Sequence, residues 1–224
     1  MALTANILAA DIHRLMVTDE RFGYSWEERH GAGLQTFDVD GVPVTLGVGD
    51  YDCSSSTITA WKLALAAFGY GDILSGASFT GNIKWVFLRT GLFEWRTDFA
   101  NAQRGDLYLD EDTHVAMCQG NGQLSEFSSN EFGGCYGGQR GDQTGWESHI
   151  TGYYRGHWDG YLHWIGEIGD DMAISTQDKK DIARMTAEEL LNRSLAVSGE
   201  KAPVPFWQLV SWTYRYAKDL ASRK

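Results

Sequence analysis

The amino-acid sequence predicts an α+β fold, and three observations support this. Apolar residues recur at helical spacing in residues 4–16 and again in residues 53–68. Short β-strand patterns follow at residues 105–109, 114–118 and 123–128, separated by an acidic turn and a Gly-Asn-Gly turn. The length of 224 residues, with 26 Gly and 3 Pro, suits one loop-rich domain with a small appendage.

The charge balance and the apolar segments exclude two classes of partner. Lys and Arg total 19 against 30 Asp and Glu, which gives a formal net charge of −11 at pH 7. Such a balance disfavours phosphate backbones, so we expect no nucleic acid partner. The longest apolar stretch, residues 58–68, contains Lys62 and is too short to cross a bilayer, so we expect no membrane partner.

The three cysteines are an odd number and are dispersed at Cys53, Cys118 and Cys135. They do not form a disulfide framework, which favours synthesis in a reducing compartment and leaves at least one free thiol. Residues 1–11 lack the basic region and the unbroken apolar run of a secretory signal peptide. We therefore expect a chain made without an export leader.

The N-terminal half is expected to contain a helix, a hairpin and a second helix. Thr4 is a suitable N-cap for the first helix. Alternating apolar residues within residues 31–50 predict a hairpin or an extended loop, and the Asp-Val-Asp-Gly run at 38–41 predicts a turn rather than a calcium site. Apolar residues spaced 3, 4 and 3 predict a buried helix that begins near Cys53, directly after Asp52.

The second half is expected to form an antiparallel meander followed by loops. Residues 83–97 have mixed apolar character and predict no definite element. The three strand patterns between residues 105 and 128 predict the meander. Residues 133–145 are dense in Gly and polar side chains, and residues 153–165 predict a last strand or two.

The composition changes after Gly169, where Gly becomes rare and helix formers dominate. Residues 177–195 and 206–223 predict two helices separated by prolines. We therefore divide the chain into a domain of residues 1–168 and a helical C-terminal segment of residues 169–224.

Three residues stand in an order that suits nucleophilic catalysis. A thiol at a helix N-terminus, as expected for Cys53, lies near unpaired N–H groups that stabilise the thiolate. His114 begins a strand, and Glu126 lies on the next strand, where both can face the same side of the sheet. His114 can then transfer a proton while Glu126 orients its ring. From spacing alone, an inert buried cysteine and a structural histidine are the alternative.

Two other interpretations are weaker. His149, His157 and His163 are spaced 8 and 6 apart, which matches no zinc pattern, so we expect no metal and no cofactor. The aromatic residues of segment 146–164 can stack on sugar rings or fill a core, and the core interpretation is favoured for most of them. Cys118 and Cys135 are expected to be structural.

Several short motifs raise a family resemblance. Tyr24-Ser25, the block Tyr51-Asp52-Cys53-Ser54-Ser55, the run Arg104-Gly105-Asp106-Leu107 and the strand led by His114 together resemble the NlpC-type and CHAP-type cysteine peptidoglycan hydrolases. The resemblance covers residues 5–165 and looks closest to phage and prophage endolysins of the amidase type. It implies a papain-like α+β domain, with N-terminal helices packed on an antiparallel sheet.

The resemblance also implies roles for individual residues. Cys53 would be the nucleophile, His114 the general base and acid, and Glu126 the third member of the triad. Tyr24, Asp52 and Ser54 match positions that flank the nucleophile, where substrate binds. Gln143 and Glu147 are expected to line the substrate groove, with a turn led by Asp142 and a solvated Glu147 as the alternative.

The implied function is cleavage of an amide in bacterial peptidoglycan, at the bond between N-acetylmuramic acid and L-alanine. A stem-peptide or cross-bridge endopeptidase is the alternative, as are a catalytically silent wall-binding protein and a cysteine transferase. The partner would be the wall of a Gram-positive host. The enzyme would accumulate in the host cytoplasm and reach the wall after release by a holin. The C-terminal helices would serve docking, self-association as a homo-oligomer, or wall binding.

Overall fold

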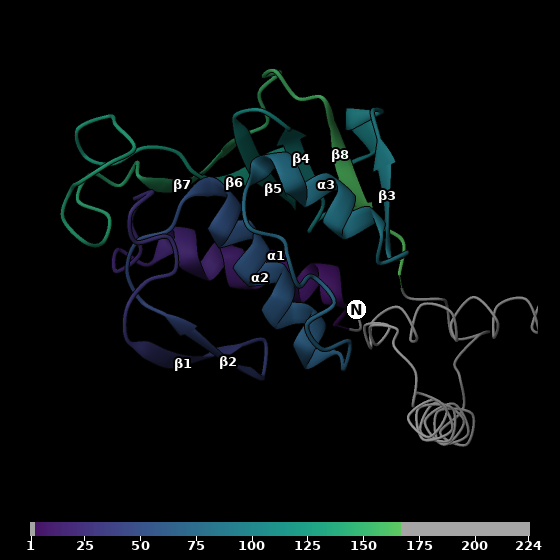
Figure 1. Ribbon diagram of the computed structural model, residues 1–224, viewed down its shortest axis with the longest axis horizontal. Coiled ribbons are helices and arrows are strands. Elements are labelled where there is room, and N and C mark those ends of the chain that lie inside the picture. Colours follow the sequence, from purple (N-terminus) through teal and green to yellow (C-terminus); the bar gives the residue numbers. More distant parts are fainter. Residues whose placement is uncertain (1–2, 167–224) are drawn as a thin grey trace, which may run out of the picture. The chain divides into compact units, whose positions relative to one another are not determined.

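The computed structural model describes residues 3–166, which Figure 1 shows as a layer of helices against a layer of strands. The predicted C-terminal segment, residues 169–224, and its helices lie outside the described residues. Helix α1 spans Ala5–Thr18 and helix α2 spans Cys53–Ala67, and the two pack side by side against the sheet. The predicted α+β class is confirmed.

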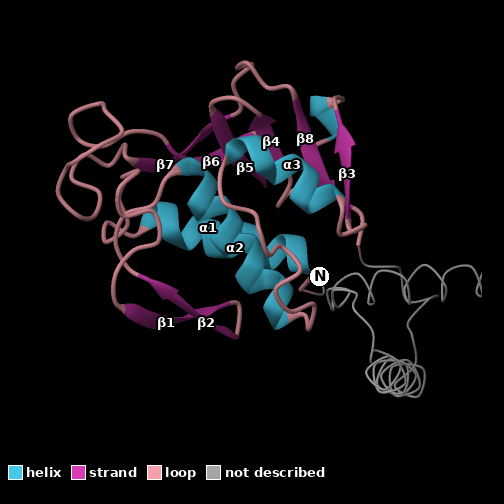
Figure 2. Ribbon diagram, viewed as in Figure 1, coloured by secondary structure: helices cyan, strands magenta, loops and turns pink. Residues whose placement is uncertain are grey.

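A two-stranded hairpin lies apart from the main sheet, on the far side of the helices in Figure 2. Strand β1 spans Leu34–Val39 and pairs antiparallel with β2, which spans Val42–Gly47. Asp40 and Gly41 both have positive φ, and the Gly41 N–H donates to Asp38 Oδ1 at 3.0 Å. The predicted hairpin and its turn at 38–41 are therefore confirmed.

The main sheet has six strands, all antiparallel, in the order β3-β8-β4-β5-β6-β7. Strands β4, β5 and β6 form the predicted meander, and the turn between β5 and β6 has positive φ at Asn121 and Gly122, as a type I′ turn requires. The strands are β3 Phe93–Arg96, β4 Leu107–Asp110, β5 His114–Gly120, β6 Gln123–Phe127, β7 Ser148–Gly152 and β8 Gly160–Trp164.

Two parts of the sheet differ from the sequence-based expectation. Residues 83–97, for which no element was predicted, contain the end of helix α3, Thr80–Leu88, and strand β3. Strand β8 lies within residues 153–165, where a last strand or two was predicted, whereas β7 ends before residue 153 and was not predicted. Strand β7 is a half-buried edge strand that is defined by its pairing with β6. Its mostly polar residues have no strong alternating pattern from which a strand could be predicted. A short 3₁₀ helix, Phe99–Asn101, follows β3.

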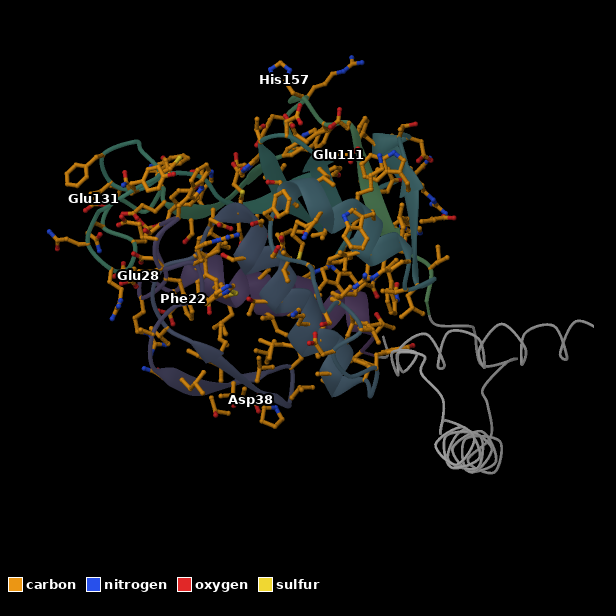
Figure 3. The ribbon with its side chains drawn as sticks, viewed as in Figure 1. Phe22, Glu28, Asp38, Glu111, Glu131 and His157 are labelled. Carbon is orange, nitrogen blue, oxygen red and sulfur yellow. The ribbon has the colours of Figure 1, made fainter. Side chains whose placement is uncertain are left out.

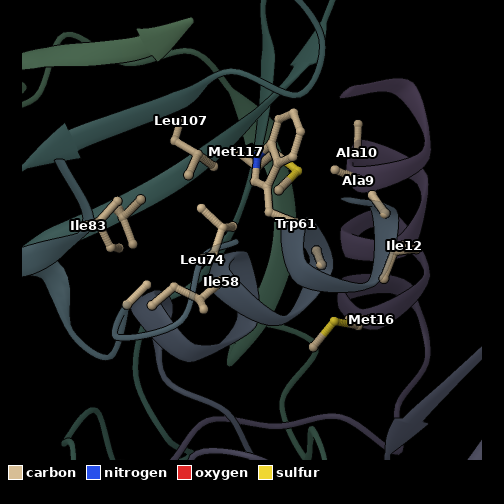
Figure 4. Close-up of a cluster of buried hydrophobic side chains, with 14 of the residues drawn as sticks. Ala9, Ala10, Ile12, Met16, Ile58, Trp61, Leu74, Ile83, Leu107 and Met117 are labelled. Atoms are coloured by element: carbon tan, nitrogen blue, oxygen red, sulfur yellow. The ribbon is translucent and has the colours of Figure 1, made fainter. Parts of the chain in front are cut away.

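The main core lies between the helices and one face of the sheet. Figure 4 shows Trp61 of α2 in one cluster with Leu107 of β4, Met117 of β5 and the small residues Ala9 and Ala10 of α1. Alternate residues on the other face of the central strands form a second cluster around Tyr108, Cys118 and Tyr161. Within residues 3–166, no helix combines the length and apolar character needed to span a bilayer.

Candidate active site

Cys53 is the first residue of α2, and the residues around it fix where this helix begins. Asp52 is the N-cap: its Oδ1 accepts the Ser55 N–H at 2.6 Å, while the Ser55 hydroxyl accepts the Asp52 N–H at 2.9 Å. This reciprocal capping box satisfies two N–H groups of the first turn. The Cys53 side chain thereby lies at the positive end of the helix, where a thiolate is stabilised.

The side chains of Asp52 and Ser54 both form polar contacts at the start of helix α2. Arg29 Nε lies 2.5 Å from Asp52 Oδ2, and the Arg29 guanidinium also donates to the Ser54 hydroxyl at 3.0 Å. The Ser54 hydroxyl donates to Asp52 Oδ1 at 2.7 Å. Both side chains are buried and hydrogen-bonded within the protein, and their contacts hold the start of α2 in position. Their role in binding substrate stays a prediction.

A series of buried hydrogen bonds links the backbone of Cys53 to helix α1 and strand β6. His13 of α1 lies between the hydroxyl of Ser125, 2.6 Å from Nδ1, and the hydroxyl of Ser56, 3.1 Å from Nε2. The Ser56 hydroxyl donates in turn to the Cys53 carbonyl at 3.1 Å. Burial lowers the pKa of His13 to about 3, so the ring is neutral and ties α1, α2 and β6 together without adding charge.

His114 and Glu126 meet across strands β5 and β6. The register places Met117 opposite Ser125, so Glu126 is a diagonal neighbour of His114 on the same side of the sheet. His114 Nε2 lies 2.9 Å from Glu126 Oε2. Cys53 lies close enough to the His114 ring to raise the pKa of His114. The structure thus brings together the three residues expected to form the triad.

The electrostatics of the three residues favour a charged histidine. Burial lowers the pKa of His114, but the hydrogen bonds and charges of Cys53 and Glu126 outweigh burial and raise this pKa to about 9. Burial raises the pKa of Glu126, but hydrogen bonds from His114, His149 and Tyr154 outweigh it and lower this pKa to about 2. An imidazolium beside Cys53 attracts the negative thiolate, the nucleophilic form.

Tyr24 lies near Cys53. It forms a parallel bridge with Tyr51, two residues before Cys53, and its hydroxyl lies 3.9 Å from Cys135 Sγ. Burial, together with the charges of Cys53 and Cys135, raises the pKa of Tyr24, so the hydroxyl stays protonated. Of the residues predicted to bind substrate, Tyr24 has a hydroxyl group beside the thiol.

Gln143 lies in the Gly-rich loop and Glu147 lies just after it, and the two side chains differ in exposure. Glu147 is buried, and its two carboxylate oxygens accept the backbone N–H groups of Tyr24 at 3.2 Å and Gln143 at 3.0 Å. Glu147 therefore links the loop to the Tyr24 segment. Its burial shows that the expectation of a solvated side chain was wrong, whereas its role in lining a substrate groove stays a prediction. Gln143 is exposed, and its side-chain amide donates to the Arg140 carbonyl at 3.1 Å.

Three residues near the triad were not predicted. His149 Nε2 lies 3.1 Å from Glu126 Oε1, and the Tyr154 hydroxyl donates to Glu126 Oε2 at 2.7 Å. Trp158 stacks on the His114 ring, with ring centroids 5.8 Å apart. The long loop between β6 and β7 separates these residues from the triad in sequence. A strand pattern at residues 148–152 would have been the signal for His149.

The aromatic residues divide between core and surface. Tyr161 and Trp164 are buried, as expected for most of the 146–164 cluster, whereas Trp146 is 67% exposed. Another exposed pair comes from the segment after Tyr24: Trp26 packs edge-on against Tyr136, with ring centroids 5.3 Å apart. Within residues 3–166, no group of three or more His, Cys, Asp or Glu side chains is arranged to hold a metal ion.

The pKa shifts of the histidine and the glutamate predict how the pair stabilises the fold. The raised pKa of His114 means that its charge contributes fully below its ordinary value of 6.5, and that this contribution is lost as pH rises through about 9. The lowered pKa of Glu126 means that its charge contributes fully above 4.5 and is lost as pH falls through about 2. Both contributions are therefore complete between pH 4.5 and 6.5.

We expect the stability advantage of the wild type over His114→Gln to be largest in this interval and to shrink as pH passes 9. Glutamine keeps a hydrogen-bond donor but cannot be charged, so the difference isolates the titration. Urea unfolding of both proteins at about pH 5.5 and about pH 10 measures this difference. An advantage that is equal at both pH values, or larger at the higher one, would contradict the assigned charges.

Comparisons with known proteins identify one matching family and several similar structures. The model described as "Endolysin-like domain" matches residues 3–125, which contain Cys53 and His114. The chain is similar to the P60 domain of antigen MAP1204 from M. avium subspecies paratuberculosis, at 20% identity and a TM-score of 0.39, over 72% of this chain and 98% of that one. It is also similar to the peptidoglycan hydrolase RipB from Mycobacterium tuberculosis, at 20% identity and a TM-score of 0.40, over 75% of this chain and 69% of that one. No curated protein matches it.

Proposed function

Because the chain belongs to the endolysin-like domain family, we propose that it is a cysteine peptidoglycan hydrolase that acts as an N-acetylmuramoyl-L-alanine amidase. The observation that carries the proposal is the position of His114, 2.9 Å from Glu126 and close enough to Cys53 for the two to interact electrostatically. A nucleophile, a proton carrier and an orienting carboxylate in this order are the groups that acyl transfer requires.

The mechanism follows from these positions. The Cys53 thiolate attacks the carbonyl carbon of the amide, and the oxyanion that forms accepts a hydrogen bond from the Cys53 backbone N–H at the start of α2. His114 donates its proton to the departing amine, which leaves a thioester on Cys53. His114 then removes a proton from water, and the resulting hydroxide attacks the thioester and restores the thiolate. Glu126 keeps the imidazole ring oriented throughout.

The choice of the amide next to the sugar rests on the exposed aromatic pair. Trp26 is 46% exposed and Tyr136 is 64% exposed, and their rings are in contact. Trp26 lies two residues after Tyr24, which is close enough to Cys53 for the charge of Cys53 to raise the pKa of Tyr24. In the muramoyl bond, the sugar lies on the carbonyl side, which remains attached to the enzyme in the thioester. Exposed aromatic faces at this place suit the apolar faces of sugar rings.

Digestion of purified Gram-positive peptidoglycan, followed by mass spectrometry of the fragments, tests the proposed bond. We expect glycan chains with free lactoyl carboxyl groups and stem peptides that begin with a free L-alanine amine. New termini inside the stem peptide or the cross-bridge would identify an endopeptidase instead. Intact peptidoglycan after prolonged incubation with the wild type would contradict the hydrolase assignment itself.

Replacing Glu126 tests its role in orienting the histidine. We expect Glu126→Ala to lower kcat by about 10²-fold, because His114 Nε2 loses the carboxylate that accepts its hydrogen bond. A loss of this size is typical when proton-transfer catalysis is impaired. Glu126→Gln keeps a carbonyl acceptor and should retain more activity than Glu126→Ala. Initial rates of peptidoglycan solubilisation measure both. Wild-type activity in Glu126→Ala would show that another group orients His114.

A further inference from the structure

His149 lies opposite Glu126 in the pairing of β6 with β7, outside the predicted triad. Its Nε2 is 3.1 Å from Glu126 Oε1, and its Nδ1 is 3.1 Å from the carbonyl oxygen of Trp146. The side chain is 15% exposed, and the Trp146 ring covers it with centroids 5.0 Å apart. Both ring nitrogens of His149 are therefore engaged at hydrogen-bond distance.

The two partners decide the protonation state of His149. A backbone carbonyl and an ionised carboxylate accept hydrogen bonds and have no proton to donate. Each nitrogen of His149 must therefore carry a hydrogen. A neutral imidazole has one N–H, and the imidazolium has two. The geometry fits a positively charged His149.

The Glu126 carboxylate needs such a partner because it is nearly buried, with 7% of its side chain exposed. Its Oε2 accepts hydrogen bonds from His114 at 2.9 Å and from Tyr154 at 2.7 Å, while Oε1 faces His149. A buried carboxylate stays ionised when charged or hydrogen-bonding groups compensate for the lost water. His149 supplies this compensation on the oxygen that points away from His114.

The groups around His149 come from several elements. Glu126 of β6 raises the pKa of His149 through the hydrogen bond and its charge, against the effect of burial. The Trp146 carbonyl and the charge of Asp142, both from the segment before β7, raise this pKa further. Beyond Glu126 lie His114 of β5 and Tyr154 of the segment after β7.

We propose that His149 is a positioning residue, a permanent imidazolium that keeps the Glu126 carboxylate ionised and directs its Oε2 toward His114. The catalytic consequence rests on the proposed hydrolase function, whereas the protonation state of His149 does not. His149 is thus a fourth residue of the site. It acts through Glu126 and does not touch the substrate.

Nitrogen-15 NMR of the histidine rings tests the charge without any substrate. In the wild type at about pH 7, we expect both nitrogens of His149 to be protonated, and Glu126→Gln to lower the pKa of His149 toward its ordinary value. His157, which points away from the domain in Figure 3, serves as the internal reference and should not change. A neutral His149 in the wild type at that pH would overturn the proposal.

Kinetics of two variants test the positioning role. We expect His149→Ala to lower kcat about 10-fold with little change in KM, because a group that acts through Glu126 does not bind substrate. His149→Gln can still donate to Glu126 Oε1 and should recover most of kcat near neutral pH. Because glutamine lacks the charge, the acid limb of its pH profile should move to higher pH.

The control is His157→Ala, which removes an exposed histidine from the neighbouring loop and should match the wild type. Wild-type kcat in His149→Ala, or a pH profile of His149→Gln that coincides with the wild type, would overturn the positioning role. The two arms also separate the two proposals. A charged His149 in a wild type that leaves peptidoglycan intact would refute the hydrolase function alone.

Discussion

Cys53→Ala is expected to abolish peptidoglycan cleavage, with a loss of at least about 10³-fold in kcat, because removal of a nucleophile eliminates the covalent pathway. The substitution leaves the fold intact. The thiol is a small buried group, and the helix start depends on Asp52 and Ser55 rather than on Cys53. The fall in turbidity of a purified wall suspension measures the activity, and urea unfolding checks the fold.

The matched control is Cys118→Ala. Cys118 is also buried, but it lies on β5 in the second cluster, where its sulfur is 3.7 Å from the Tyr108 hydroxyl. We expect this variant to keep wild-type kcat, with a modest loss of stability. Equal rates of cleavage by Cys53→Ala and the wild type would rule out Cys53 as the nucleophile.

Trp61→Ala is expected to cause the largest loss of stability, about 3–5 kcal/mol in the free energy of unfolding. Trp61 is fully buried in α2, and its ring packs against Phe93 and Trp164, with centroids 4.7 and 5.2 Å away. Its indole N–H also donates to the Gly105 carbonyl at 3.1 Å, so the substitution leaves both a cavity and an unpaired buried acceptor.

Urea unfolding measures this loss, and Trp85→Ala is the control. Trp85 belongs to helix α3 and is 53% exposed, with the Arg89 guanidinium over its ring at 4.8 Å. An exposed cation–π contact of this kind contributes about 0.5–1 kcal/mol, so the control should lose far less stability. Similar losses in the two variants would show that Trp61 does not anchor the core.

The sequence was most informative where one local pattern determines the structure. The Asp52 to Ser55 run predicts the start of α2, because capping depends on residues within one turn. The turn at Asn121 and Gly122 predicts that β5 pairs with β6, since a type I′ turn joins neighbouring strands. The turn alone does not predict that His114 and Glu126 share a face, because a register shift between Cys118 and Gly120 sets the pairing of the strands beyond it.

The parts that could not be predicted depend on distant pairings. His149 reaches Glu126 through the pairing of β7 with β6, across a long Gly-rich loop that carries no periodic pattern. The burial of Glu147 likewise depends on contact with Tyr24, more than a hundred residues earlier. Asp52 and Ser54 flank Cys53 in the family motif, but the motif does not reveal that Arg29 binds both of their side chains.

Titration of Cys53 with iodoacetamide tests the central claim most directly, because it relates one thiol to the activity. The wild type is treated with increasing amounts of the reagent at about pH 6, where His114 is an imidazolium. Peptide mass mapping gives the modified fraction of each cysteine, and wall turbidity gives the remaining activity. We predict that Cys53 reacts first and that activity falls to zero in proportion to its modification. Full activity in protein whose Cys53 is completely alkylated would contradict the account.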